Sequence, residues 1–393
     1  MFKFILKWIL RFEIVIFFWR NPMTIIAITG SVGKTSTKEA ISNVLANNSN
    51  VITNVGNLNT EFGIPLSLLR LTFTPTFFGY CKNIILGFLR CFKKTPYKFA
   101  VLEMGAGKPG DLSYLISFIK PNVGVITNIG ESHLEFFKTK EALKKEKTLV
   151  VKSLDPNGWA VLNGDDENLS NIQLPTSHVL YYGFKTTNDI YASDIVITTN
   201  GTSFKIHWGG SFVPVMINTF GDGYVYASLA AAATGIIFGL NLAEIADRLS
   251  KLKTLPGRLN VLVKDQITVI DDTYNASLQS MAVALNFLKD NKGRKIAVLG
   301  DMLELGSFEA EGHIKVGKKV SEIADIFIGV GKRMEIACDG ARENMLEKNV
   351  ISVSSALDAS KLLQSILKAG DVILIKGSQA MHMDDIITLL WKQ

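Results

Sequence analysis

The sequence predicts an α/β protein with a doubly wound, mostly parallel central sheet and a second, smaller α/β domain. Three observations support this class. Short β-branched runs alternate with helical stretches from Met23 onward, a glycine turn joins the first run to a helix, and the alternation starts afresh after residue 258. A length of 393 residues suits two or three domains.

The composition indicates a globular protein, because 47% of the residues are hydrophobic and 20% are charged. The net charge of +6 suits phosphate-bearing small molecules or an anionic membrane surface. It is too small to indicate a nucleic-acid partner. Cys81, Cys91 and Cys338 form no CxxC pair, so we expect a reduced, cytoplasmic protein.

Residues 1–20 are expected to form an amphipathic N-terminal helix. Lys3, Lys7 and Arg11 recur at every fourth position and share one helical face. These charges interrupt the apolar run, so neither a signal peptide nor a membrane-spanning helix is expected. The helix lies either in a membrane interface or on the protein's own core, since both places bury one face.

The doubly wound sheet is predicted within a central domain, residues 21–254. Its parallel strands are expected at 24–29, 99–104, 123–129 and 159–163, and its helices at 35–46, 110–118 and 140–153. An apolar and basic insertion at 74–96 either joins residues 2–20 in a membrane-facing patch or packs over the sheet as a loop.

Antiparallel strands are expected over 189–220, with turns at Asn200-Gly201 and Gly209-Gly210, before a helix at 225–240. The linker LPGR at 255–258 then begins the second domain, residues 255–393. Its strand patterns are typical of a Rossmann-like fold and lie at 267–272, 295–300, 326–331 and 371–377.

A phosphate-binding loop is predicted where the first strand runs into Gly30-Ser31-Val32-Gly33-Lys34-Thr35-Ser36 and then into a helix. This order places backbone N–H groups and the positive end of a helix around a phosphate, as in P-loop proteins. Lys34 is expected to neutralise β- and γ-phosphates, and the Thr35 hydroxyl is expected to bind magnesium. Ile28 stands where the general motif has glycine, which indicates a particular subclass. A glycine-rich turn without a ligand is the alternative.

The segment TGSVGKTS at 29–36 resembles the phosphate loop of the Mur ligases, and most closely the branch that adds D-alanyl-D-alanine to a muramoyl peptide. Further segments resemble this family, in family order, over about 350 residues. They are GNLNTEFGIPLSLL (56–69), VLEMGAGKPGDLSYL (101–115), TNIGESHLEFF (127–137), LNGDDE (162–167), VIDDTYNASLQSM (269–281), AVLGDMLELG (297–306) and VILIKGS (372–378).

The resemblance implies an ATP-dependent peptide ligase of peptidoglycan synthesis that works through an acyl phosphate and releases ADP and phosphate. It implies that Glu103 and Thr35 hold the Mg²⁺ of ATP and that His133 holds a second ion. Lys147, 14 residues after His133, is implied to carry a carbamate that also binds Mg²⁺. In the C-terminal domain it implies Arg258 at the phosphates and Asp272 and Asn275 near the ribose. The residues implied near the muramoyl-peptide substrate are Asn57, Asn59, Thr60 and Lys376.

The residues alone leave structural alternatives open. Glu103 can form a strand-end salt bridge, His133 can be a satisfied structural histidine, and Lys147 can belong to a solvated helix face with Lys144 and Lys145. Asp272 can cap a helix, Arg258 can form a surface ion pair, and the polar residues at 57–60 can make a turn.

The sequence also departs from the family pattern. Only about 20 residues precede the first sheet strand, so the family's N-terminal domain for uridine diphosphate is expected to be missing. Either another protein holds that end of the donor, or it is gripped weakly, or the donor is lipid-linked. Gly223 and Tyr224 replace a His-Asn pair near the adenine, and Gln379 replaces an arginine, so those contacts do not carry over.

The expected partners are therefore a muramoyl-peptide donor and a D-alanyl-D-alanine acceptor, with ATP and Mg²⁺. The expected location is the cytoplasm, with peripheral contact at the inner face of the membrane through residues 2–20 and 74–96. A second hypothesis is another amide ligase of the superfamily, building a polyglutamate or a cyanophycin-like polymer. A third is a catalytically inactive, membrane-associated nucleotide-binding protein, against which Lys34, Glu103, His133 and Lys147 argue.

Overall fold

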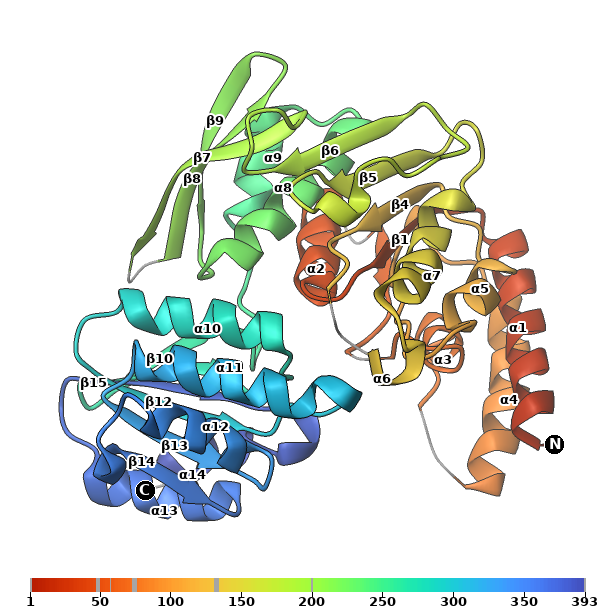
Figure 1. The fold of residues 1–393 in the computed structure, drawn as a ribbon. Helices are drawn as coiled ribbons and strands as arrows, with labels where there is room; N and C mark the ends of the chain where they lie inside the picture. The colour runs from red at the N-terminus through yellow and green to blue at the C-terminus, as the bar shows by residue number, and fades with distance from the viewer. Residues whose placement is uncertain are drawn as a thin grey trace. The chain divides into compact units, whose positions relative to one another are not determined.

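A computed structural model describes residues 2–46, 50–56, 58–72, 76–130, 134–198 and 201–391 (Figure 1). They belong to two compact units. Unit 1 comprises Met1–Gly130, Thr139–Asn218 and Asp222–Leu252, and unit 2 comprises Glu131–Lys138, Thr219–Gly221 and Lys253–Gln393. Each unit contains a sheet whose strands are mostly parallel, which confirms the α/β class.

Unit 1 is built on a nine-stranded sheet in the order β2-β3-β1-β4-β5-β6-β7-β8-β9. The pairings from β2 to β7 are parallel, whereas β8 pairs antiparallel with β7 and with β9. The strands are β1 (Thr24–Thr29), β2 (Val51–Thr53), β3 (Phe99–Glu103), β4 (Val123–Ile126), β5 (Trp159–Asn163), β6 (Val179–Gly183), β7 (Ile190–Thr198), β8 (Gly201–Trp208) and β9 (Ser211–Ile217).

Helices cover both faces of this sheet, because alternate strand residues enter different cores. Val125 packs in the core with α2 (Lys34–Leu45), α8 (Asp222–Ile237) and α9 (Leu242–Leu249). Its neighbour Ile126 packs in the other core, with α7 (Lys140–Lys152). The remaining helices of unit 1 are α1 (Phe2–Arg20), α3 (Gly63–Leu68), α4 (Phe77–Cys91), α5 (Asp111–Ile116) and η1 (Glu167–Leu169).

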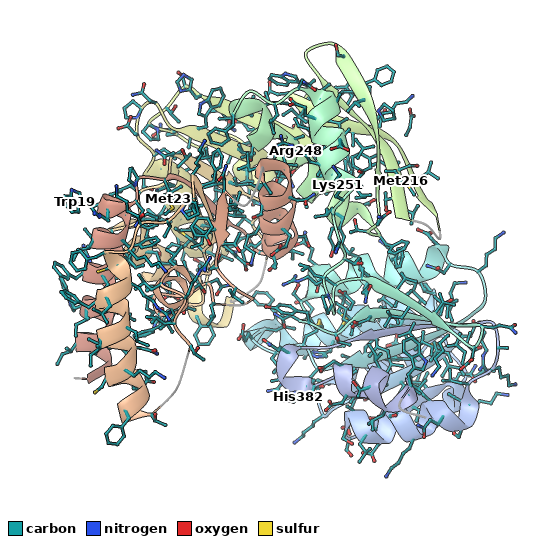
Figure 2. The ribbon with its side chains drawn as sticks, turned by 180° about the vertical axis from the view of Figure 1, so that it is seen from behind. Trp19, Met23, Met216, Arg248, Lys251 and His382 are labelled. Atoms are coloured by element: carbon teal, nitrogen blue, oxygen red, sulfur yellow. The ribbon has the colours of Figure 1, made fainter. Side chains whose placement is uncertain are left out.

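The predicted N-terminal helix forms and lies beside α4, as Figures 1 and 2 both show. Its inner side is buried through Leu6, Leu10, Ile14 and Phe17. For this side, the alternative that the helix packs on the protein's own core is therefore correct. The basic flank is also engaged: the ammonium of Lys7 lies 3.7 Å from the centre of the Tyr114 ring. Among the described residues, no helix is long and apolar enough to cross a membrane.

The insertion predicted at 74–96 contains a helix, α4, which is capped by the Thr76 side chain. Its contact with α1 depends on a small residue. A Cβ atom at Gly87 would lie 2.2 Å from Oε2 of Glu13, so only glycine leaves room for this side chain. Glu13 is consequently buried between the two helices, at 1% exposure.

Unit 2 is built on a six-stranded sheet in the order β10-β11-β15-β12-β13-β14, parallel except for the β10–β11 pair. Helices α10, α11 and α12 lie over one face, and α13 and α14 over the other. The strands are β10 (Asn260–Lys264), β11 (Ile267–Asp272), β12 (Arg294–Gly300), β13 (Ile326–Val330), β14 (Val350–Val353) and β15 (Asp371–Lys376). The helices are α6 (Leu134–Phe137), α10 (Leu278–Asp290), η2 (Gly306–Phe308), α11 (Glu309–Ser321), α12 (Met334–Arg342), η3 (Glu347–Asn349), α13 (Ala356–Ile366), η4 (Gln379–Met381) and α14 (Asp384–Trp391).

The strands and helices expected from the sequence all form, with ends that shift by a few residues. The helix expected from residue 225 begins at Asp222, and Gly209 and Gly210 both have positive φ at the predicted turn. The turn predicted at Asn200 lies outside the described residues. Four short strands went unpredicted: β2, β6, β10 and β14. The three cysteines are free thiols.

Candidate active site

The predicted phosphate loop joins β1 to α2 and depends on two glycines. Gly33 has a φ of 82°, a left-handed conformation that favours glycine. Gly30 has a φ of 149°, and a Cβ atom there would lie 1.9 Å from Oγ1 of Thr127. The loop therefore passes so close to the end of β4 that a side chain at position 30 does not fit.

The end of β4 also holds the loop by hydrogen bonds. Oδ1 of Asn128 accepts from the backbone N–H of Ser31 at 3.1 Å and of Val32 at 2.9 Å. The Thr127 hydroxyl donates to the Val32 carbonyl at 2.6 Å. Asn128 thus engages two N–H groups of the loop, and the first turn of a helix such as α2 is where N–H groups generally bind an anion.

Lys34 and Thr35 begin α2 and lie at the mouth of this loop. Nζ of Lys34 donates to the Gly30 carbonyl at 2.8 Å and to the Ser31 carbonyl at 3.2 Å, so the ammonium is held over the loop. Thr35 and Ser36 are buried, at 8% exposure each. All seven predicted loop residues, 30–36, are thus contiguous in one strand-turn-helix element.

Glu103, at the end of β3, is buried beside the loop and contacts Thr35. Its Oε2 accepts from the Thr35 hydroxyl at 2.8 Å and its Oε1 accepts from Nδ2 of Asn59 at 3.0 Å. Within the described part of the chain Glu103 forms no ion pair with Lys or Arg, so the salt-bridge alternative is not supported there. A carboxylate beside a hydroxyl offers the hard oxygen ligands that Mg²⁺ prefers.

Asn54 fixes the backbone of Glu103 from the neighbouring strand. Its Oδ1 accepts from the Glu103 N–H at 2.8 Å and its Nδ2 donates to the Glu103 carbonyl at 3.1 Å. The Asn54 carbonyl in turn accepts from Nζ of Lys38 at 2.8 Å. Lys38 and Asn54 are both almost fully buried, so helix α2 is joined to the strand end that carries Glu103.

Lys147 of α7 points at the phosphate loop and is only 1% exposed. Its Nζ donates to the Ser31 hydroxyl at 3.2 Å. Burial, followed by the positive charge of Lys34, holds the pKa of Lys147 well below its usual range. Lys145 is exposed, so the solvated face of α7 carries that lysine and not Lys147.

The predicted residues of unit 2 also lie together. Nζ of Lys376 donates to Oδ2 of Asp272 at 2.6 Å and to the Asn275 carbonyl at 2.7 Å. Oδ1 of Asp272 accepts from the Leu259 N–H, and the Arg258 guanidinium stacks 4.0 Å from the centre of the Tyr274 ring. Asp272 is therefore half of a part-buried ion pair with Lys376, and the helix that follows it, α10, is capped by Ser277 instead.

Two predicted residues, His133 and Asn57, lie outside the described residues. Thr60 is exposed, and its hydroxyl accepts from the Gly63 N–H at 3.3 Å, which is a local turn contact. Within the described ranges, no three His, Cys, Asp or Glu side chains come together as a metal cluster. A Mg²⁺ held by Thr35 and Glu103 fits this finding, because Mg²⁺ commonly takes one carboxylate and completes its shell with phosphate and water.

Sequence reasoning missed Asn54, Lys38 and Asn128 as residues that hold the site. Asn128 lies two residues after the end of β4, and a polar side chain near the end of a central strand was an available signal. Asn54 and Lys38 had no such signal, because their partners are backbone groups from another segment.

Known proteins are similar to this chain in sequence and in fold. Residues 28–79 and 82–235 match the Mur ligase middle domain, and residues 257–379 match the Mur ligase glutamate ligase domain. The UDP-N-acetylmuramoyl-tripeptide–D-alanyl-D-alanine ligase of Buchnera aphidicola subsp. Baizongia pistaciae is 33% identical over 94% of this chain and 76% of its own length. The Bacillus subtilis ligase of that name is 31% identical over 92% of this chain and 75% of its own.

Solved structures agree with these matches. The MurF ligase of Thermotoga maritima, solved in complex with ADP, has a TM-score of 0.82 and 28% identity, covering 98% of this chain and 82% of its own. MurF of Acinetobacter baumannii has a TM-score of 0.83 and 25% identity, and the match covers 99% of this chain and 80% of the other. Two matched domains and relatives above 30% identity lead to one conclusion: this chain belongs to the Mur ligase family.

Proposed function

We propose that this chain is an ATP-dependent peptide ligase that adds D-alanyl-D-alanine to a UDP-MurNAc-tripeptide in peptidoglycan synthesis. The observation that carries the proposal is the contact between Thr35 and Glu103 at the foot of the phosphate loop. Relatives that match over three quarters of their own length bear the name of this ligase. One of the similar solved structures holds ADP, which supports a nucleotide substrate.

The reaction requires two steps. The carboxylate of the tripeptide attacks the γ-phosphorus of ATP, so that ADP leaves and an acyl phosphate forms. The amine of D-alanyl-D-alanine then attacks the acyl carbon, loses a proton and displaces phosphate. Negative charge gathers at the phosphoryl group in the first step, and preset cations stabilise it.

The residues of unit 1 have different roles in these two steps. The ammonium of Lys34 neutralises the β- and γ-phosphates, and the N–H groups at the start of α2 orient them. Thr35 and Glu103 would hold Mg²⁺, which when bound polarises the transferred phosphoryl group. Asn59 fixes the second oxygen of Glu103 and, with Asn57 and Thr60, approaches the substrate. His133 is proposed as a ligand of a second Mg²⁺.

Lys147 is proposed to act as a carbamate. Its depressed pKa raises the share of the uncharged amine, and an uncharged amine attacks carbon dioxide, forming a carbamate and releasing one proton. The product is a carboxylate-like group beside Ser31, which provides an oxygen ligand for Mg²⁺. This supports a binding role for a lysine that would otherwise repel Lys34.

In unit 2 we propose that Arg258 meets the phosphates, that Asp272 and Asn275 lie near the ribose, and that Lys376 lies near the substrate. Lys376 and Asp272 form an ion pair, which supports the proposal that the role of each residue depends on the other. Asp272 holds the lysine ammonium in place, so removal of the carboxylate leaves the buried Lys376 charge without its counter-ion.

We also propose peripheral contact with a membrane through residues 2–20 and 74–96, because α1 and α4 expose large apolar side chains. Flotation of the full chain with liposomes, compared with a chain lacking residues 1–20, tests this contact. Equal failure to float contradicts it.

Phosphate release tests the ligase reaction. Release from ATP is expected only when both UDP-MurNAc-tripeptide and D-alanyl-D-alanine are present, with a product joined by an amide bond in mass spectrometry. Lys34→Ala is the inactive control. Stimulation by L-glutamate in place of D-alanyl-D-alanine would indicate a polyglutamate-type ligase instead. ATP binding without any phosphate release would indicate an inactive nucleotide-binding protein.

A further inference from the structure

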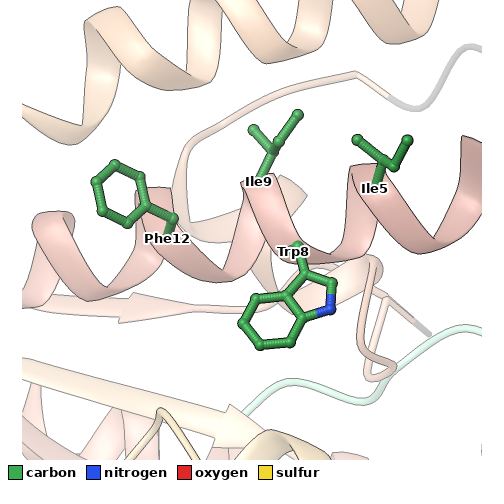
Figure 3. A pocket seen from close by; sticks show the side chains of 4 residues that line it. All are labelled: Ile5, Trp8, Ile9 and Phe12. Atoms are coloured by element: carbon green, nitrogen blue, oxygen red, sulfur yellow. The ribbon is translucent and has the colours of Figure 1, made fainter.

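The outer side of α1 carries an apolar stripe that the fold itself does not use. Ile5, Trp8, Phe12, Val15 and Trp19 follow a helical repeat, and all are exposed, from 45% for Val15 to 78% for Trp19. Figure 2 shows Trp19 at the end of α1. Ile5, Trp8, Ile9 and Phe12 line an apolar hollow on this helix (Figure 3). The inner side of α1 already packs on the protein through buried residues, so the exposed stripe does not contribute to the core.

The neighbouring helix α4 has the same two-sided design. Its inner side holds Gly87 and the buried Cys91, whereas the outer side exposes Phe78 at 84%, Ile85 at 63% and Leu89 at 64%. Exposed large apolar side chains are normal when they are scattered singly. Nine of them lie on two adjacent helices, so they are not scattered, and they indicate a surface that binds a partner.

The charge of these segments indicates which kind of partner binds the exposed apolar surface. Residues 2–20 and 76–98 contain nine Lys and Arg and one acidic residue, Glu13, a net charge of +8. The whole chain has +6, so everything else together is −2. Glu13 is turned inward and buried, whereas Arg20, Lys82, Lys93 and Lys94 are exposed. The net positive charge of this protein therefore lies on α1, on α4 and on the seven residues that follow α4, next to the exposed apolar side chains.

We propose that the outer sides of α1 and α4 bind the surface of an anionic phospholipid bilayer as one unit. The apolar side chains enter the boundary between headgroups and acyl chains, where tryptophan is favoured, and the lysines at the ends of the helices meet lipid phosphates. Neither helix meets the length and hydropathy needed to cross the bilayer. The inference deepens the proposed membrane contact by naming the lipid charge, and it is independent of the ligase chemistry.

Binding of the full chain to vesicles tests the proposal. Flotation is compared for vesicles of phosphatidylcholine alone and vesicles that also contain phosphatidylglycerol. The chain is expected to float with the anionic vesicles at least tenfold better, and less well as salt is raised. Equal flotation with both vesicles overturns the anionic specificity, and flotation with neither overturns the proposal.

Two variants and a matched control separate the contributions. Trp8→Ser with Phe12→Ser removes exposed apolar area, and Lys93→Gln with Lys94→Gln removes exposed charge. Each pair is expected to lower flotation at least fivefold, and only the second is expected to reduce the salt dependence. Leu346→Ser with Lys348→Gln, also exposed but in unit 2, is the control that leaves flotation unchanged.

Two further measurements distinguish other outcomes. Phosphate release in solution should stay the same in both variant pairs, since none of these residues lies at the phosphate loop. A failed ligase assay with intact flotation contradicts the proposed reaction and leaves this inference standing.

Light scattering of the wild type and the Trp8→Ser, Phe12→Ser variant shows whether a second copy covers α1. A dimer that the variant abolishes, without vesicle binding, overturns the proposal.

Discussion

The side-chain nitrogen of Lys147 lies 3.2 Å from the Ser31 hydroxyl, so a lysine of α7 contacts the phosphate loop directly. Lys34 lies on the same loop, and its charge adds to burial in lowering the pKa of Lys147. Burial and repulsion from Lys34 both disfavour the charged form of Lys147. The loop therefore favours an uncharged amine at this position, which can react with carbon dioxide.

Lys147→Arg is expected to lower the ligase rate by about a hundredfold or more, because a guanidinium stays charged and forms no carbamate. With ¹³C-labelled carbon dioxide, the wild type should show a carbamate signal in ¹³C NMR that the variant lacks. Lys145→Arg, exposed on the same helix, is the matched control. An unchanged rate in Lys147→Arg contradicts the assignment.

Lys38→Met tests the support of Glu103. The variant removes the ammonium that holds the Asn54 carbonyl, and Asn54 holds the backbone of Glu103. The Mg²⁺ concentration for half-maximal activity is expected to rise about tenfold to a hundredfold. Binding of a fluorescent ADP analogue without Mg²⁺ should change little, because Lys38 does not touch the loop. Lys361→Met, exposed on α13, is the control; a loss of ADP binding with the Mg²⁺ requirement unchanged would point to a general loss of structure.

Much of this site was predictable from local sequence. Glu103 ends a buried apolar run, where a carboxylate needs a partner, and the lysine and hydroxyl of the phosphate loop follow a strand in the order that phosphate binding requires. Asn54 and Lys38 were not predictable, because each is defined by a backbone group that folding brings near. For α1 the sequence left two alternatives, because a membrane interface and the protein core would each bury one face of an amphipathic helix. Its inner side docks on the protein, and its outer side remains exposed.

Gly30→Ala is expected to disrupt the phosphate loop. Its φ of 149° is unfavourable for an L side chain, and the new methyl group would overlap the Thr127 hydroxyl. Affinity for ATP should fall at least tenfold in a nucleotide titration, and stability should fall by about 1–3 kcal/mol. Gly239→Ala has a φ of 81° and nothing within 4 Å, so it should cost about 1 kcal/mol and leave ATP affinity intact. Equal ATP affinity in Gly30→Ala and the wild type would show that the loop adapts.

Glu13 makes the docking of α1 dependent on pH. Neither of its carboxylate oxygens has a hydrogen-bond partner within the described part of the chain, and burial raises its pKa from 4.5 to about 7. The titratable group on α4 that it faces is the Cys91 thiol, whose pKa is also raised, first by burial and then by Glu13. The buried carboxyl is therefore uncharged when α1 is docked at low pH.

The sign of the effect follows from these values. The docked state holds the proton more tightly than the released helix, so its stabilisation is complete below pH 4.5 and is lost as pH rises toward 7. The loss is on the order of 3 kcal/mol at most. Hydrogen exchange of the α1 amides, corrected for the intrinsic effect of pH, should show more frequent opening at pH 8 than at pH 5.5.

Glu13→Met is expected to abolish this pH dependence and to protect α1 more strongly than the wild type at pH 8. The side chain has similar length and needs no hydrogen-bond partner. Glu13→Gln should also remove the pH dependence but protect less, because its buried amide is as poorly paired as the carboxyl it replaces. Glu347→Gln, on exposed η3, is the control for the loss of one negative charge. If α1 of the wild type exchanges equally at both pH values, Glu13 keeps its charge inside the helix pair and a partner for it must exist.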